Sequence, residues 1–171
     1  MPAIDRPLSD CRYEIPSGGD WAIHRGGAVF ADGAESVVIS GNRFDQIDGN
    51  GVFLSRYARN FSVKANDMVA IGDSGILVVG ASGSGMVDNS KNRNYPAYNV
   101  IEENHIDTVG VWVKQTAAYF KSVTRGNNIR NNVFHDGPRS GARFCAQSDG
   151  RFTRNDEFDI NTDGFCIKND A

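Results

Sequence analysis

The feature that most constrains the fold of this chain is a recurring pair of residues, an apolar side chain followed three positions later by asparagine. The copies that define the repeat are Ile39/Asn42, Val63/Asn66, Ile101/Asn104, Ile129/Asn132 and Phe152/Asn155. A glycine stands nine residues after four of these asparagines, which gives a period of 23 to 24 residues. A period of this length indicates a solenoid, in which each repeat forms one structural unit.

Each repeat glycine precedes a short stretch of alternating apolar residues, the pattern of a strand with one buried side. These pairs are Ala28/Phe30, Val52/Leu54, Ile76/Val78, Ala142/Phe144 and Phe165/Ile167. The 171 residues include 19 glycines and 16 asparagines, residue types that favour turns over helices. The leucine-rich core of a leucine-rich repeat is absent. The sequence therefore predicts an all-β fold, a right-handed single-stranded parallel β-helix of about 6–7 coils of about 24 residues.

Stacking of such coils predicts two columns of equivalent residues. The repeated asparagines are expected to form an amide ladder along the stack. The column expected in the interior is Phe44, Met68, Ile106 and Phe134. We expect a single domain over residues 1–171, with 1–17 as a poorly defined lead-in, a loop insertion at 81–98, and a smaller insertion near 111–115 that places the next glycine position on Ala117. Such a repeat can continue beyond either end, so we expect the chain to be part of a longer solenoid.

Charge, hydropathy and cysteine content exclude several classes of protein. The net charge of −3 argues against nucleic-acid binding. The longest apolar stretch, Ile76–Val79, is too short for a transmembrane segment. The first residues lack the apolar core of a secretory signal. The three cysteines have no metal-ligand spacing, which predicts no metal site, although a bridge between Cys145 and Cys166 is conceivable.

Solenoids carry their function on the outer face, where the repeat places several candidate binding residues. Counting from the glycine positions puts Tyr119, Lys121 and Arg143 on the outside of one sheet. An aromatic ring beside cations suits an anionic sugar chain, because a pyranose packs on the ring while the cations pair with carboxylate or sulfate. The alternative is an ordinary solvated charged face.

Two pairs of residues are candidates for acid–base chemistry. Asp107 and His135 are expected side by side on adjacent coils, either as a catalytic pair or as a surface ion pair. Asp48 and Asp73 lie in equivalent turns, offset by one residue. Two carboxylates on adjacent coils can serve as the acid and the nucleophile or base of a glycosidase. They can equally cap backbone N–H groups in their turns.

Five stretches of the chain together resemble right-handed β-helix proteins of the pectin-lyase-like superfamily, in particular a marine microbial and algal group related to glycoside hydrolases and polysaccharide lyases. They are His24–Phe30, Asp48–Ser55, Ile71–Ile76, Gly110–Thr116 and Arg130–Gly141. The resemblance implies action on, or binding to, a polysaccharide outside the cell. It also implies an active groove around the positions that match the family's motifs, which are Asp48, Asp73, Lys114, Gln115 and Arg139.

The chain departs from this group after Phe144, where an Asn-Asp-Gly-rich segment and later Asp-His-Gly-Pro and Trp-Asp-Arg motifs are absent. Three hypotheses follow. The first is a glycoside hydrolase using Asp48 and Asp73, or a lyase using Lys114, Arg139 and Arg143, with Ca²⁺ expected only for the lyase. The second is a non-catalytic carbohydrate-binding or adhesive module. The third is a shortened relative without activity of its own.

Overall fold

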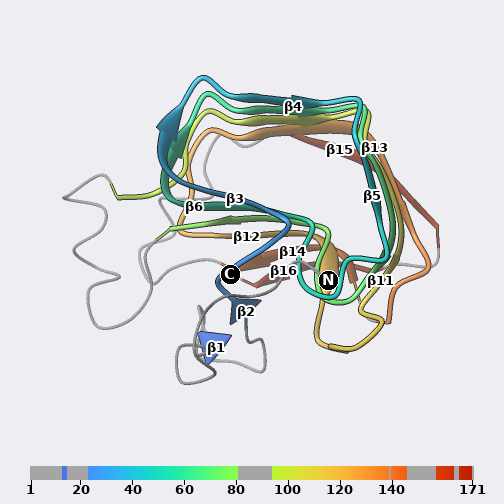
Figure 1. Ribbon diagram of the computed structural model, residues 1–171. Helices are drawn as coiled ribbons and strands as arrows, with labels where there is room; N and C mark the ends of the chain where they lie inside the picture. The colour runs from blue at the N-terminus through green and yellow to red at the C-terminus, as the bar shows by residue number, and fades with distance from the viewer. Residues whose placement is uncertain are drawn as a thin grey trace.

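The computed structural model describes residues 13–14, 23–80, 94–138, 140–145, 157–163 and 166–170, with side chains over 24–80 and 94–138. Every element described is a strand. A short antiparallel pair, β1 (Tyr13–Glu14) with β2 (Ile23–His24), precedes the stack, and all other pairings are parallel. The chain therefore winds in coils that lie over one another (Figure 1).

Two sheets form the walls of this parallel β-helix. The six-stranded sheet has the order β16-β14-β12-β9-β6-β3. Its strands are β3 (Val29–Glu35), β6 (Val52–Arg59), β9 (Ile76–Val79), β12 (Ala117–Ser122), β14 (Ser140–Cys145) and β16 (Cys166–Asp170). The second sheet has two branches, here called the β4 branch and the β5 branch, which are joined by the long strand β13 (Asn128–His135).

The two branches lie on different sides of the coil, along the top and the right of Figure 1. The β4 branch contains β4 (Val38–Ser40), β7 (Ser62–Lys64), β10 (Val100–Glu102) and the start of β13. The β5 branch contains β5 (Arg43–Asp45), β8 (Asp67–Ile71), β11 (His105–Val109) and the end of β13. Strand β15 (Glu157–Asp163) pairs with β13 on its other edge.

The predicted interior column is confirmed. Phe44, Met68, Ile106 and Phe134 stand opposite one another in register and are all buried. The apolar members of the repeated pair, from Ile39 to Ile129, form a second buried column. Residues Val52, Leu54, Ile76 and Val78 of the six-stranded sheet pack against both columns in one core.

The predicted amide ladder is also confirmed over four coils. Side-chain Nδ2 atoms donate to Oδ1 of the next asparagine from Asn42 to Asn66 at 3.1 Å, from Asn66 to Asn104 at 2.9 Å and from Asn104 to Asn132 at 2.9 Å. A second, shorter ladder joins Asn99 to Asn127 at 2.9 Å. These amides, all buried except that of Asn42, also bond to backbone groups at the corners of the coils, as Asn104 Nδ2 does to Val63 O at 2.9 Å.

Three rows of left-handed residues bend each coil. One row contains Ser36, Asn60, Tyr98 and Gly126, the next Gly41, Ala65, Glu103 and Asn131, and the third Gln46, Ala70, Thr108 and Asp136, all with φ between 50° and 67°. Residues other than glycine rarely adopt this conformation, because their Cβ atoms crowd the backbone. Here most of their N–H groups donate to a carbonyl of the next coil, as Ala65 N does to Glu102 O at 3.1 Å.

This strain gives a first prediction. Ala65 is exposed with φ of 50°, and the equivalent position in the preceding coil is already Gly41. We expect Ala65→Gly to raise the free energy of unfolding by about 0.5–1 kcal/mol, because the relief of left-handed strain exceeds the entropy added to the unfolded chain. The matched control is Ala58→Gly in strand β6, where the buried methyl group is lost and the change should destabilise. Urea denaturation measures both, and an Ala65→Gly variant as unstable as Ala58→Gly would contradict the prediction.

The register of β12 corrects the predicted outer face of the six-stranded sheet. Tyr119 pairs with Ile76, and Lys121 pairs with Val78, so both share interior columns instead of facing solvent. Tyr119 is fully buried in the main core, and Lys121 is 4% exposed. The glycine position falls on Ala118, one residue later than predicted, and a slip of one residue moves every side chain of a strand to the opposite face. The expectation that Tyr119 and Lys121 form a sugar-binding surface is therefore wrong.

The outer side of this sheet carries a second buried apolar cluster instead. Phe53, Leu77, Val79, Ala117 and Phe120 make up this cluster. The Arg25 guanidinium lies 5.4 Å from the centre of the Phe53 ring and donates to Ser55 Oγ at 2.9 Å and Gly80 O at 2.8 Å. This face is thus covered over β6, β9 and β12. Arg143 pairs with Phe120 in backbone register, and its side chain is outside the described part.

The described backbone contradicts one further expectation, and two others fall wholly or mostly outside the described residues. The last repeat pair, Phe152/Asn155, lies outside the described residues, and Phe158 of β15 takes the place opposite Ile129. A bridge between Cys145 and Cys166 is wrong, because Cys145 pairs with Asp170 and Cys166 pairs with Ser140, at the other end of β14. Most of the expected 81–98 insertion is undescribed, but Ala97 at its end rejoins the stack between Arg59 and Arg125.

The described residues include no helix long and apolar enough to cross a bilayer.

Candidate functional site

Several residues singled out in the sequence lie in one row of turns, between the β5 branch and the six-stranded sheet. This turn row consists of residues 46–51, 72–75 and 110–116, one segment from each of three successive coils. Backbone hydrogen bonds hold the segments together, from Asp73 N to Gly49 O at 3.1 Å and from Gly110 N to Asp73 O at 2.9 Å. The turn row therefore brings the segments carrying Asp48, Asp73, Lys114 and Gln115 together.

The two carboxyl groups of the turn row have different surroundings. Asp48 is exposed, whereas Asp73 is 5% exposed and accepts a hydrogen bond from Ser74 Oγ at 3.3 Å. Burial raises the pKa of Asp73 to about 6, against a smaller opposing effect of the hydrogen bonds from Ser74. Loss of water disfavours the carboxylate more than two neutral donors favour it. Asp73 can therefore hold a proton at a mildly acidic pH.

The close approach of these turns depends on Gly72. A methyl group at this position would collide with Asp48 O and would lie 2.7 Å from Trp112 Cδ1. Gly72 N donates to Ile47 O at 2.6 Å, and Gly72 O accepts from Trp112 N at 3.0 Å. The indole of Trp112 is 70% exposed in spite of its size. Trp112 was not among the residues predicted from the sequence, although a tryptophan within an insertion is a visible signal.

Of the other residues predicted in the active groove, the structure describes Lys114 and Gln115 but not Arg139. Lys114 is exposed, but its Nζ donates to Gly110 O at 2.7 Å and to Val111 O at 2.9 Å within its own loop. Gln115 is exposed on the same loop. Arg139 lies outside the described residues. Of the residues considered for lyase chemistry, the structure thus describes only the side chain of Lys114, and its ammonium group is occupied by carbonyl oxygens.

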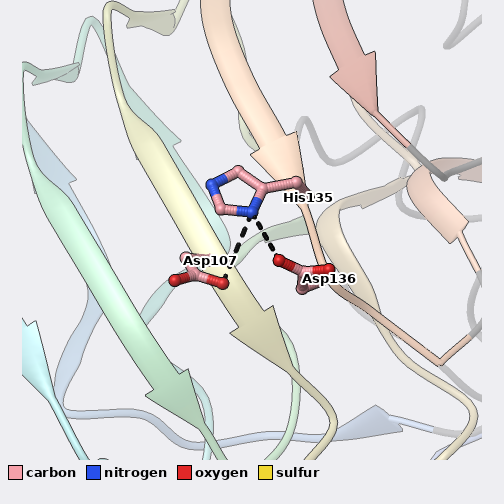
Figure 2. Close-up of side chains that lie close together, drawn as sticks. All are labelled: Asp107, His135 and Asp136. Atoms are coloured by element: carbon pink, nitrogen blue, oxygen red, sulfur yellow. Dashed lines mark hydrogen bonds and ion pairs between the residues drawn. The ribbon is translucent and has the colours of Figure 1, made fainter.

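A second group of polar side chains lies on the β5 branch, at the strand ends that lead into the turn row. Asp107 and His135 stand opposite each other on β11 and β13, as predicted, with His135 Nδ1 3.4 Å from Asp107 Oδ1. Asp136 Oδ2 lies 2.9 Å from the same nitrogen (Figure 2). Neighbouring residues of a strand normally point to opposite faces. The left-handed conformation of Asp136, with φ of 53°, turns its carboxylate to the side of His135.

The polar chain continues from His135 toward earlier coils. His135 Nε2 lies 2.7 Å from His105 Nε2, and His105 Nδ1 lies 2.7 Å from Asp67 Oδ1. Asp67 also pairs with Arg43. The hydrogen bond from His105, followed by the attraction of Arg43, holds the pKa of Asp67 below its usual range. Two imidazoles in direct contact, with carboxylates at either end, therefore form a continuous polar chain across three coils.

His105 and Asp136 were absent from the sequence-based candidates. His105 occupies the register position of Arg43 and Asp67, and this column follows from the same repeat arithmetic that placed Asp107 beside His135. Asp136 is different, because a strand pattern puts it on the opposite face from His135. The left-handed bend of the backbone at Asp136 brings its side chain to that of His135, and a strand pattern does not predict this bend.

Comparison with known proteins agrees with the architecture. The family model described as the right-handed beta helix region matches residues 24–171. No significant match was found among curated proteins or among solved structures. The match covers most of the chain, and its limits include every strand of the stacked coils. This protein belongs to the family of right-handed parallel β-helix proteins.

Proposed function

We propose that this protein is a polysaccharide-acting glycoside hydrolase with its active groove along the turn row. The observation that carries the proposal is the contrast between Asp73 and Asp48, which lie on hydrogen-bonded neighbouring turns in unlike environments. One carboxyl group is buried with its pKa raised to about 6, and the other is exposed. Glycosidases use such a pair, in which environment separates the acid from the nucleophile or base.

Each residue then has a defined role. Asp73 donates a proton to the departing glycosidic oxygen, and Asp48 acts on the other side of the scissile bond as nucleophile or base. The exposed Trp112 ring lies against Gly72, the residue before Asp73, and offers a flat apolar surface on which a sugar ring can pack. Hydrolysis is favoured over elimination, because Lys114 Nζ already donates to two carbonyl oxygens and is not placed to accept a proton.

A second candidate is a carbohydrate-binding module without catalysis. It is favoured by the hydrogen bonds that Asp73 accepts within its own turn from Ser74, since an aspartate before serine commonly caps a turn. In that case Trp112 alone would contact the glycan. The two candidates share a binding surface and differ in the need for Asp48 and Asp73.

Product analysis separates these candidates. The full chain is incubated with uronate-containing, sulfated and neutral polysaccharides, and reducing ends are measured together with ultraviolet absorbance. We expect new reducing ends without the absorbance of an unsaturated sugar, and their loss in Asp48→Asn and in Asp73→Asn. Absorbance would indicate a lyase. Glycan binding without products, retained in both variants, would indicate the binding module.

Trp112→Ala tests whether a sugar ring packs on the indole of Trp112. Loss of an exposed stacking ring is expected to raise KM, or the dissociation constant of a bound glycan, by about 10-fold, which corresponds to about 1.4 kcal/mol. The fold should be unaffected, because the indole is exposed and its backbone hydrogen bond to Gly72 O remains. Trp112→Phe keeps an aromatic surface and should restore most of the affinity. An unchanged KM and affinity in Trp112→Ala would place the glycan elsewhere.

A further inference from the structure

The group around His135 is not used by the proposed hydrolysis, yet it gathers three potential metal ligands at one point. We propose that His135, Asp107 and Asp136 bind one divalent first-row transition-metal ion, such as Zn²⁺. Each residue offers one ligand atom, and these atoms all lie within 4.8 Å of one another. The proposal does not depend on the glycosidase assignment.

The distances suit a single ion. Bonds of about 2.1 Å place neighbouring ligand atoms about 3.0 Å apart in octahedral geometry and about 3.4 Å apart in tetrahedral geometry. His135 Nδ1 lies 2.9 Å from Asp136 Oδ2 and 3.4 Å from Asp107 Oδ1. Both carboxylates thus approach the same nitrogen at separations typical of ligands that share an ion. Figure 2 shows the two oxygens converging on it from β11 and from the end of β13.

The number of hydrogens that His135 Nδ1 can carry favours a bound ion at this nitrogen over hydrogen bonds alone. His135 Nδ1 carries at most one hydrogen, which can satisfy only one of its two carboxylate neighbours. An ion at Nδ1 binds to both oxygens at once and leaves the ring hydrogen on Nε2. That hydrogen then points at His105 Nε2, 2.7 Å away, while His105 Nδ1–H donates to Asp67. Every nitrogen of the two rings then has a partner.

The neighbouring groups have the arrangement that supports metal ligands in proteins. A ligating histidine commonly donates its other ring N–H to an acceptor that fixes its orientation. Here His105 is the acceptor, Asp67 holds His105 through Nδ1, and Arg43 pairs with Asp67. Asp107 is oriented by Thr108 Oγ1, which donates to its Oδ1 at 2.7 Å. We therefore assign His105 as a positioning residue for the site.

The ligand set also selects the class of ion. One imidazole and two carboxylates suit Zn²⁺, Mn²⁺ or Co²⁺, whereas Ca²⁺ and Mg²⁺ prefer oxygen ligands alone. The side chains of His135 and Asp107 are 26% and 27% exposed, and that of Asp136 is 75% exposed. Solvent can therefore reach the site and supply the remaining ligands, a property of open sites as opposed to closed structural ones.

Equilibrium dialysis of the full chain against ZnCl₂, followed by metal analysis, tests the proposal. The cysteines are first alkylated, because thiolates also bind Zn²⁺. We expect one Zn²⁺ per chain and a rise in melting temperature on binding. Asp107→Asn, Asp136→Asn and His135→Gln should each abolish stoichiometric binding while keeping a cooperative thermal transition. Asp45→Asn is the matched control, because Asp45 belongs to the same column two coils before Asp107 and lies outside the ligand group.

His105 variants test its positioning role. His105→Ala leaves all three ligands in place but should weaken Zn²⁺ binding about 10- to 100-fold, the usual effect of losing an outer hydrogen-bond partner. His105→Gln, which can again accept from His135 Nε2, should recover most of the affinity. Folded wild-type protein without stoichiometric Zn²⁺, or binding that survives all three ligand variants, would overturn the proposal. Asp48→Asn and Asp73→Asn should leave Zn²⁺ binding unchanged, so the outcome is independent of the hydrolase test.

Discussion

Replacing Asn104 by alanine is expected to lower the free energy of unfolding by about 3–5 kcal/mol, one of the two largest effects that the structure implies. The side chain is 1% exposed and makes four hydrogen bonds. Its Oδ1 accepts from the backbone N and Nδ2 of Asn66 at 3.1 and 2.9 Å, and its Nδ2 donates to Val63 O and to Asn132 Oδ1, both at 2.9 Å. Alanine would leave four polar atoms in the interior without these bonds.

Asn42→Ala provides the matched control at the exposed end of the same ladder. Asn42 is exposed, and its Nδ2 donates to Asn66 Oδ1 and to Ser40 O. Water can replace these bonds, so we expect a loss below about 1 kcal/mol. Guanidinium denaturation monitored by circular dichroism measures both variants. If Asn104→Ala were no more destabilising than Asn42→Ala, the hydrogen bonds of the ladder would contribute little to the stability of the fold.

The ladder and the core columns were predictable because they depend only on spacing. Residues 24 positions apart fall at the same place in successive coils, and alternation then decides which side chains are internal. Phe44, Met68, Ile106 and Phe134 were aligned correctly even across the insertion, since the asparagine next to each column anchors the count. The pairing of Asp107 with His135 followed from the same anchor.

The prediction failed where no asparagine anchored the count. After the loop at 110–116 the glycine position had to be assigned to an alanine, and Ala117 and Ala118 are equivalent by composition. The structure places Ala118 there, with Ala118 O close to Gly75. This difference of one residue exchanged the inner and outer faces of β12. Tyr119 was therefore predicted outside although it is in the core.

Local backbone bends are the other reason for missed residues. Sequence patterns for strands assign neighbouring residues to opposite faces, but each coil contains residues such as Thr108 and Asp136 in left-handed conformation at the strand ends. Such bends bring consecutive side chains to the same side, which is how Asp136 joins His135. The turn row is similar, because the contact of Trp112 with Gly72 depends on loop geometry that spacing does not encode.

Asp73→Asn is expected to stabilise the protein at neutral and alkaline pH while removing its activity. The pKa of Asp73 is about 6 in the folded protein against 3.8 for an unperturbed aspartate. Below pH 3.8 the carboxyl group is protonated in both states, so it contributes no difference. As the pH rises toward 6 the unfolded state loses its proton first, so the free energy of unfolding falls. Above pH 6 the folded protein carries the full cost of a buried charge, up to about 3 kcal/mol.

Asparagine avoids that cost, because it is neutral at every pH and its Oδ1 can still accept from Ser74. The stability difference between Asp73→Asn and wild type should therefore be close to zero at pH 3.5 and should grow to a maximum of about 3 kcal/mol near pH 8. Urea denaturation across this pH range measures it. Asp67→Asn is a control of opposite sign, since the lowered pKa of Asp67 means that its charge stabilises the folded state and that this contribution disappears as the pH falls.

The effects of Asp73→Asn on stability and on activity, taken together, distinguish a catalytic carboxyl group from one that only caps its turn. A cap that stabilises its turn should make Asp73→Asn neutral or destabilising at pH 8. A catalytic acid held in an unfavourable environment should make the variant more stable and reduce glycan hydrolysis about 10²- to 10⁴-fold. Higher stability together with lost activity would mean that the fold keeps a destabilising charge at Asp73 because the reaction requires a carboxyl group there. Higher stability with unchanged activity would exclude Asp73 from catalysis, even though its burial is as described.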